Sequence, residues 1–164
     1  MDFAESDEQQ MIRELVRDWA EEVLPPTIAK RDSEQIPPSA EWKQFCELGL
    51  QGVTIPEEFG GNPVDDISES IIIEELARVD PSLAVMFCVH VGLCAKAIVL
   101  HGNQQQKETY LPRLAAGEVG AYSLSEAGAG NRSHHEHRSG APRSLRQLHR
   151  AGRRVRGLRQ SGAL

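Results

Sequence analysis

The histidines near the carboxyl end are the residues of this chain that could most readily bind a metal. The sequence HHEH occupies residues 134–137, and imidazole and carboxylate groups are ligands of transition metals. Its spacing differs from H-E-x-x-H, which places two histidines on one face of a helix around zinc. We therefore predict no evolved metal site here, although nickel or copper could bind adventitiously.

A second candidate is the run of small residues that ends at Gly130. Tyr122 and Leu124 alternate with serines, which is typical of a short strand, and a tight turn at 128–130 comes next. The turn is not a dinucleotide-binding fingerprint, because the third glycine is missing and the strand does not lead into a helix. These residues indicate that a second, β-rich domain begins here.

Other polar candidates lie within predicted helices and loops. His90 lies in a long apolar stretch, where a core or pocket-lining role is favoured over chemistry. Glu57 and Glu58 come directly after Pro56, and we expect them to serve loop structure and domain contacts rather than acid–base catalysis. The three cysteines form neither a metal-ligand spacing nor an even-numbered disulfide framework, which favours a reduced, cytoplasmic protein.

Helix-capping residues and apolar residues at helical spacing organise the chain before these candidates. Ser6 with Gln9 predicts a capping box, and Pro25 and Pro26 are expected to end the first helix. Further starts are predicted at Ser39, at Asp66 with Glu69, at Asp80 before Pro81, and at Asn103. The pattern predicts an all-α fold, a helical bundle of five or six helices over residues 1–118.

One predicted helix is nearly long enough to cross a bilayer, which takes about 20 residues. Residues 82–100 are almost wholly apolar, but His90 and Lys96 lie inside the stretch. A charge at membrane depth costs several kcal/mol. We therefore predict a core helix that is apolar all round because it is buried, and no membrane partner.

The charge of the chain changes sign near residue 130. Residues 1–130 hold 23 Asp and Glu against 9 Lys and Arg, a net charge of −14. Residues 131–164 hold nine Arg, no Lys and one acid, a net charge of +8. Such asymmetry is typical of a nucleic-acid or membrane arm. The absence of lysine and the scattered Gly and Pro argue against a selected arm.

Three segments carry a resemblance to a known family. They are GLQGVTIPEEFGG (49–61), IIIEELARVDPSLAV (71–85) and HGNQQQKETYLPRLAAGEVGAYSLSEAGAG (101–130). In content, order and spacing they resemble the acyl-CoA dehydrogenase family, most closely its short-chain, butyryl-type branch. The resemblance covers residues 1–130. It implies a helical N-terminal domain over 1–118 and, at 119–130, the first strand and flavin-contacting turn of an incomplete β-domain.

The resemblance also implies a flavin-dependent oxidation. Family members hold FAD, oxidise an acyl-CoA to a 2,3-enoyl-CoA, pass electrons to an electron-transfer flavoprotein, and are typically homotetramers. By position, Tyr122 and Leu124 would lie against the flavin ring and Ser125 would bind its pyrimidine edge. Gly128 and Gly130 would let the chain turn closely beside the cofactor. No catalytic residue is assigned, because the family's catalytic glutamate belongs to its C-terminal part.

Residues 131–164 depart from the family pattern. Asn131 and Arg132 stand where the family usually has serine and then an acid. Codons read one base later permit TEATMST from Asn131 and DEYVVSGK from Arg153, and both strings fit the family. We interpret the tail as out of frame and disordered, and the chain as an inactive fragment with no specific nucleic-acid partner. The alternative is a non-enzymatic helical protein whose cationic tail binds nucleic acid or another partner.

Overall fold

The structure is a computed structural model, and it describes residues 4–123. Its α-helices are α1 (Asp7–Val23), α2 (Pro25–Glu34), α3 (Ser39–Cys46), α4 (Asp66–Val79), α5 (Pro81–Cys88), α6 (Lys96–His101) and α7 (Gln104–Ala115). The π-helix η3 (Val89–Ala95) joins α5 to α6 without a break, and two short 3-10 helices, η1 (Leu50–Gly52) and η2 (Glu57–Phe59), lie between α3 and α4. The described residues thus form six helical bodies and no strand, which confirms the all-α prediction.

The helix starts reflect local capping chemistry. The capping box of α1 is present, with Ser6 and Gln9 each accepting from the other's backbone N–H at 3.2 and 3.0 Å. Asp80 caps α5 as predicted, because its carboxylate accepts from the N–H groups of Ser82 and Leu83. The same box is formed at the start of α7, where Asn103 is the cap.

Two predicted starts are displaced by one residue. Asp65, not Asp66, caps α4, because Asp65 has extended backbone angles that let its side chain accept from the first N–H groups of the helix. Ser39 is the first residue of α3 and does not cap it, since Pro38 occupies the capping position. Where two residues that could cap a helix stand side by side, such as Asp65 and Asp66, the sequence does not show which of them is the cap, so a predicted helix start is uncertain by one residue.

Pro25 has two roles, and the sequence predicted only one of them. It ends α1, whose last residue is Val23, and it begins α2, which the sequence did not predict. Proline is accepted in the first turn of a helix because the N–H it lacks has no intrahelical partner there. The chain therefore bends between two helices instead of entering a loop.

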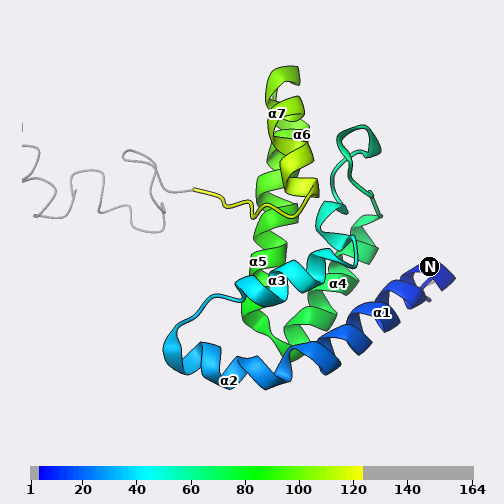
Figure 1. The fold of residues 1–164 in the computed structure, drawn as a ribbon. Coiled ribbons are helices and arrows are strands. Elements are labelled where there is room, and N and C mark those ends of the chain that lie inside the picture. The colour runs from blue at the N-terminus through cyan, green and yellow to red at the C-terminus, as the bar shows by residue number, and fades with distance from the viewer. Residues whose placement is uncertain (1–3, 124–164) are drawn as a thin grey trace, which may run out of the picture. The chain divides into compact units, whose positions relative to one another are not determined.

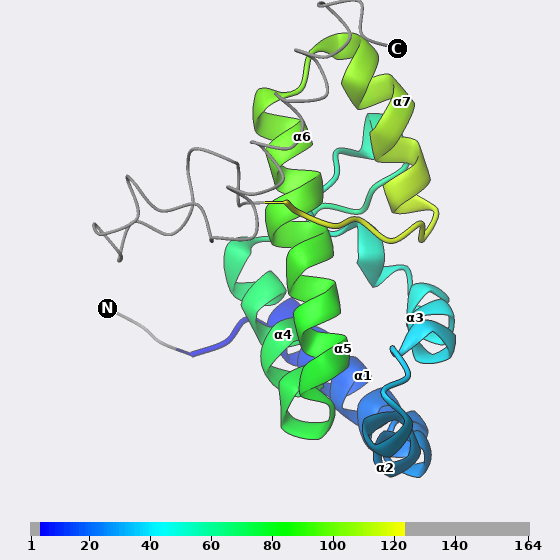
Figure 2. The same ribbon diagram turned by 90° about the vertical axis from the view of Figure 1, so that its left-hand side faces the viewer.

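The helices pack around one main core, and the most extensive contact joins helices that are distant in the chain. α1 lies along α4, α4 packs on α5, and the long rod from α5 to α6 is flanked at its far end by α7 (Figures 1 and 2). The fully buried side chains of the main core include Val16, Leu24, Phe45, Ile72, Leu76, Leu83 and Phe87. A second cluster, around Ile55, Leu111 and Ala95, joins α7 to the loop after α3.

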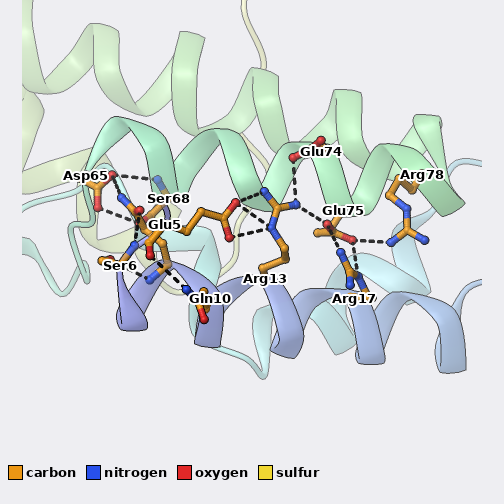
Figure 3. Close-up of polar contacts among 11 residues, drawn as sticks. Glu5, Ser6, Gln10, Arg13, Arg17, Asp65, Ser68, Glu74, Glu75 and Arg78 are labelled. Carbon is orange, nitrogen blue, oxygen red and sulfur yellow. Dashed lines mark hydrogen bonds and ion pairs between the residues drawn. The ribbon is translucent and has the colours of Figure 1, made fainter. Parts of the chain in front are cut away.

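A buried carboxylate joins α1 to α4. Glu75 is 1% exposed and accepts hydrogen bonds from Arg13 and Arg17 of α1 and from Arg78 of its own helix (Figure 3). The contacts to Arg17 measure 3.0 and 3.1 Å. These guanidinium groups, Arg17 foremost, lower the pKa of Glu75 to about 2, against the desolvation that opposes ionisation. Because each charge has a partner, the carboxylate is tolerated inside the interface.

The long rod is not buried all round, so that prediction was wrong. Pro81–His101 has a mean hydropathy of 2.2 and the length of a membrane span, yet only 33% of the apolar window is buried. Val85, Leu93 and Leu100 are between 45% and 67% exposed. The opposite side carries core residues such as Leu83 and Phe87, so we interpret the rod as a helix of the domain with one uncovered apolar side.

Candidate functional site: a clamp on the exit segment

The site is built around residues 116–122, here called the exit segment, through which the chain leaves α7 toward the predicted flavin strand. Gly117 has a φ of 96°, a left-handed conformation that other residues rarely adopt, and it turns the chain at the end of the helix. Gly120 is buried, whereas Val119 and Tyr122 are 49% and 47% exposed. The segment therefore alternates between an inward anchor and outward side chains.

Three side chains from separate elements hold the backbone at the end of α7 and along the exit segment. Trp42 of α3 donates its indole N–H to the Gly117 carbonyl at 2.8 Å. Gln51 of η1 donates to the carbonyl of Ala115, the last residue of α7, at 2.6 Å. His90 of η3 accepts from the Gly120 N–H at 2.9 Å. We call Trp42, Gln51 and His90 the clamp.

His90 is fully buried, and its two ring nitrogens have different roles. Its Nδ1 accepts from Gly120, so the ring proton must lie on Nε2, which donates to the Gln51 carbonyl at 3.1 Å. Burial lowers the pKa of His90, with a smaller opposing effect of the Gln51 carbonyl. The ring stands edge-on to Trp42, with centroids 4.9 Å apart. His90 is therefore a neutral imidazole of defined tautomer.

The π-helix explains how His90 reaches both partners. A π turn inserts one residue into the helical register, which re-aims side chains and frees carbonyl groups, and such turns are frequent at functional sites. Here the Thr54 hydroxyl donates to the Val91 carbonyl at 3.1 Å. The loop after α3 thus contacts the π-helix twice, through Thr54 and through the Gln51 carbonyl.

Close packing fixes the path of the exit segment. A Cβ added at Gly120 would lie 2.7 Å from the sulfur of Cys94, and one at Gly117 would lie 3.0 Å from the sulfur of Cys46. Burial raises the pKa of the Cys94 thiol and raises that of Cys46 to about 11. Both thiols are therefore neutral at physiological pH. The inward side of the segment is held by hydrogen bonds and packing, and the exposed Glu118 is ion-paired with Arg113 of α7 at 2.6 Å.

One acceptor of the clamp is open within the described residues. The side-chain oxygen of Gln51 is buried and has no hydrogen-bond partner there. Buried amide oxygens are nearly always satisfied, so this atom is suited to receive a donor from outside residues 4–123.

Of the five residues predicted to contact flavin, only Tyr122 belongs to the described part of the chain. It ends the exit segment with its ring half exposed, so a planar partner could pack on it. Leu124, Ser125, Gly128 and Gly130 lie outside the described residues, as does HHEH at 134–137. The strand at 119–130 stays a prediction, since residues 119–123 lie in neither helix nor strand and the rest is not described.

The sequence did not predict the clamp. His90 was placed in the core, which is where it lies, but Trp42 and Gln51 gave no functional signal. Their partners are 75 and 64 residues away in the chain and are backbone carbonyls, which no sequence pattern marks. Among residues 4–123 there is no group of three or more histidine, cysteine, aspartate or glutamate side chains that could hold a metal ion.

Comparison with known proteins places this domain. The profile of the acyl-CoA dehydrogenase N-terminal domain matches residues 6–118, which is the helical domain up to the exit segment. The chain belongs to the acyl-CoA dehydrogenase family. This confirms the resemblance carried by the three sequence segments.

Curated relatives of the family show the same coverage. The acryloyl-CoA reductase (NADH) of Anaerotignum propionicum is 38% identical over 132 residues, or 80% of this chain and 33% of the relative. The short-chain-specific acyl-CoA dehydrogenase of Clostridium acetobutylicum is 38% identical over 134 residues, or 81% and 35%. The chain thus spans about a third of the length of each of these two curated relatives.

Solved structures with 35–37% sequence identity to this chain agree with the fold. The butyryl-CoA dehydrogenase of Megasphaera elsdenii superposes with a TM-score of 0.71 at 35% identity, covering 79% of this chain and 35% of the other. An acyl-CoA dehydrogenase from Bacillus anthracis, complexed with FAD, gives a TM-score of 0.69 at 36% identity, and the match covers 77% of this chain and 22% of the other. A structure reported for the electron transferring flavoprotein of Acidaminococcus fermentans gives a TM-score of 0.73 at 37% identity, and the match covers 79% of this chain and 34% of the other.

Proposed function

We propose that this chain is the N-terminal part of an FAD-dependent acyl-CoA dehydrogenase that oxidises a short acyl-CoA to its 2,3-enoyl-CoA and passes electrons to an electron-transfer flavoprotein. The matched part spans about a third of the length of two curated relatives, and by the resemblance the catalytic glutamate belongs to the C-terminal part, so these 164 residues alone are proposed to be inactive. The observation that carries the proposal is the family match over residues 6–118, which ends within the exit segment, just before the predicted flavin strand.

The cofactor proposal is supported by the sequence and by the described end of the exit segment. FAD, when bound, supplies the hydride acceptor for oxidation of the acyl chain. In this chain, Tyr122 presents a half-exposed ring, and Leu124 and Ser125 would add an apolar side chain and a hydroxyl donor after it. An apolar platform with a few polar groups is suited to a flavin ring. The acyl-CoA dehydrogenase from Bacillus anthracis, solved as a complex with FAD, supports FAD as the cofactor.

The described domain would contribute positioning and shielding rather than bond making. Its uncovered apolar side along the rod, including Leu93 and Leu100, would be covered by the rest of an intact dehydrogenase. The charged side chains around Glu75 are engaged with one another at the α1–α4 interface. No titratable group of residues 4–123 is therefore assigned to proton transfer.

The test is to restore the shifted reading frame after Gly130 and to purify the longer protein beside the 164-residue chain. We expect the restored protein to be yellow, with stoichiometric FAD, and to be bleached by butyryl-CoA under anaerobic conditions. The 164-residue chain should hold little FAD and show no bleaching. A restored protein that folds but binds no FAD would contradict the proposal, as would bleaching by the 164-residue chain.

The non-enzymatic alternative has a distinct outcome in the same material. If residues 131–164 are a selected cationic arm, the 164-residue chain binds DNA with a steep dependence on salt, and removal of the arm abolishes a cellular phenotype. Non-specific phosphate binding by nine arginines, without a phenotype, is the result that the dehydrogenase proposal expects.

A further inference from the structure

We propose that His90 is the positioning residue of the exit segment: its neutral Nε2–H tautomer links the Gln51 carbonyl to the Gly120 N–H, fixes the backbone that carries Tyr122, and releases that backbone when the ring is protonated. The consequence for flavin rests on the proposed function. The consequence for the backbone does not, and it can be measured in the 164-residue chain.

The geometry distinguishes His90 from a histidine that merely fills the core. Its two ring nitrogens contact backbone groups 39 and 30 residues away in the chain, at 3.1 and 2.9 Å. Both partners are buried, and the ring edge lies against Trp42, which itself holds Gly117. Thus one side chain ties η1, η3 and the exit segment together, and it does so only while one nitrogen donates and the other accepts.

Protonation would invert one of these two contacts. An imidazolium carries N–H groups on both nitrogens, so Nδ1 would present a donor to the Gly120 donor at 2.9 Å. The charge would also be buried, because His90 is 0% exposed. The folded state therefore binds this proton less readily than the unfolded state does, in agreement with the lowered pKa of His90.

No acidic side chain offsets that charge among the described residues that surround η3. The two thiols beside the exit segment, Cys46 and Cys94, are neutral. Lys96 is paired with Asp66 and Glu69 of α4 at 2.9 and 3.3 Å. The remaining titratable side chains on the elements that contact η3 or the His90 ring are Glu41 and Lys43 of α3, Cys88 of α5, His101 of α6, Lys107, Glu108, Tyr110 and Arg113 of α7, and Glu118 and Tyr122 of the exit segment. Of these, Glu41 is paired with Arg31, and Arg113 with Glu118. None of these groups forms a hydrogen bond or ion pair with His90.

Two substitutions separate the functions of the two nitrogens. His90→Asn keeps an acceptor near the position of Nδ1 and loses the Nε2 donor. His90→Gln keeps a donor near Nε2 and loses the acceptor that faces Gly120. Neither side chain titrates, so both variants also remove the response to protonation.

The decisive readout is the hydrogen-exchange protection factor of the Gly120 amide in the ¹⁵N-labelled 164-residue chain. In the wild type we expect protection at neutral pH and at least a tenfold loss, with a midpoint below pH 6.5, on acidification. The amide of Asp80, which donates to Leu76 within the core, is the internal reference and should stay protected. His90→Asn should keep Gly120 protected without pH dependence, and His90→Gln should lose protection at every pH.

Several outcomes would overturn the proposal. Ring ¹⁵N shifts that place the proton on Nδ1, or that show a charged ring at neutral pH, contradict the tautomer. A Gly120 protection factor that is independent of pH in the wild type contradicts the release, and this arm needs no variant to fold. A folded His90→Gln chain that protects Gly120 as well as the wild type contradicts the positioning role.

A second arm tests the consequence for flavin in the frame-restored protein. His90→Gln should raise the Kd for FAD at least tenfold, whereas His90→Asn should stay within about threefold of the wild type. Equal FAD affinity of the wild type and His90→Gln would overturn the flavin part of the inference. A wild-type restored protein without FAD would instead refute the proposed function, and the amide measurements would still decide the role of His90.

Discussion

Replacing Glu75 with glutamine should destabilise the domain by an amount that depends on pH. Glu75 is 1% exposed and is surrounded by Arg13, Arg17 and Arg78, which lower its pKa from 4.5 to about 2 (Figure 3). A carboxyl group with a lowered pKa in the folded state stabilises the protein above the unfolded pKa. That stabilisation is lost as the pH falls from about 4.5 toward about 2.

The size of the effect is set by the shift in pKa. Lowering the pKa from 4.5 to about 2 corresponds to about 3 kcal/mol of stability at neutral pH, because each tenfold change in an equilibrium constant is worth about 1.4 kcal/mol. At pH 3 the same linkage removes about 2 kcal/mol of that amount, because the unfolded carboxyl group is then mostly protonated and the folded one is not. The difference in unfolding free energy between the wild type and Glu75→Gln should therefore fall from about 3 kcal/mol at pH 7 to about 1 kcal/mol at pH 3.

Urea unfolding monitored by tryptophan fluorescence measures this difference, since Trp19 and Trp42 pack in or against the core. Glu74→Gln is the matched control. Glu74 directly precedes Glu75 and also pairs with Arg13, at 2.9 Å, but its side chain is 61% exposed. Its replacement should therefore lower the free energy of unfolding by less than about 1 kcal/mol at either pH. A Glu75→Gln difference that is the same at pH 7 and pH 3 would refute the argument from the lowered pKa.

Three further predictions concern packing, a buried ion network and thiol reactivity. Gly61→Ala should abolish soluble folding, because the added Cβ would lie 1.9 Å from the carbonyl oxygen of Ile55. Gly49→Ala is the control: its Cβ would meet open space, and the φ of 75° alone should lower the free energy of unfolding, measured by urea titration, by about 1 to 3 kcal/mol. Arg31 forms ion pairs with the buried carboxylates of Glu41 and Asp80, so Arg31→Met leaves both without their cation and should destabilise the domain by about 3 to 5 kcal/mol. An unchanged melting temperature in a thermal melt would contradict this. Iodoacetamide at pH 8 should label Cys46 roughly 100-fold more slowly than a thiol of ordinary pKa, because a pKa of about 11 leaves little thiolate. Mass spectrometry measures the labelling rate, and a rate equal to that of an exposed thiol would contradict the raised pKa.

Local signals predicted most of the fold. The capping boxes at Ser6 and Asn103 and the cap at Asp80 need only residues two or three positions apart, so sequence alone reveals them. The start of α2 at Pro25 was missed because proline both ends and begins helices, and the choice depends on how the residues after the proline pack.

Long-range contacts could not be predicted in the same way. Arg78 lies three residues after Glu75 in the same helix, but Arg13 and Arg17, which complete the set of partners that makes its burial possible, come from α1 and are 62 and 58 residues away in the chain. His90 was correctly expected in the core or at a pocket, but its tautomer depends on backbone groups of residues 51 and 120. The π-helix that aims His90 is stabilised by Thr54, 37 residues from its partner, so no local pattern indicates it.

The most direct test of the proposed identity is to sequence the gene from the codon of Gly120 past the codon of Leu164 to the first stop in each frame. The account predicts that the frame one base later continues, after Gly130, into the rest of a β-domain and a C-terminal helical domain with a catalytic glutamate. If no such frame exists, the chain is not a frameshifted dehydrogenase, and residues 131–164 must be explained as a tail in their own right.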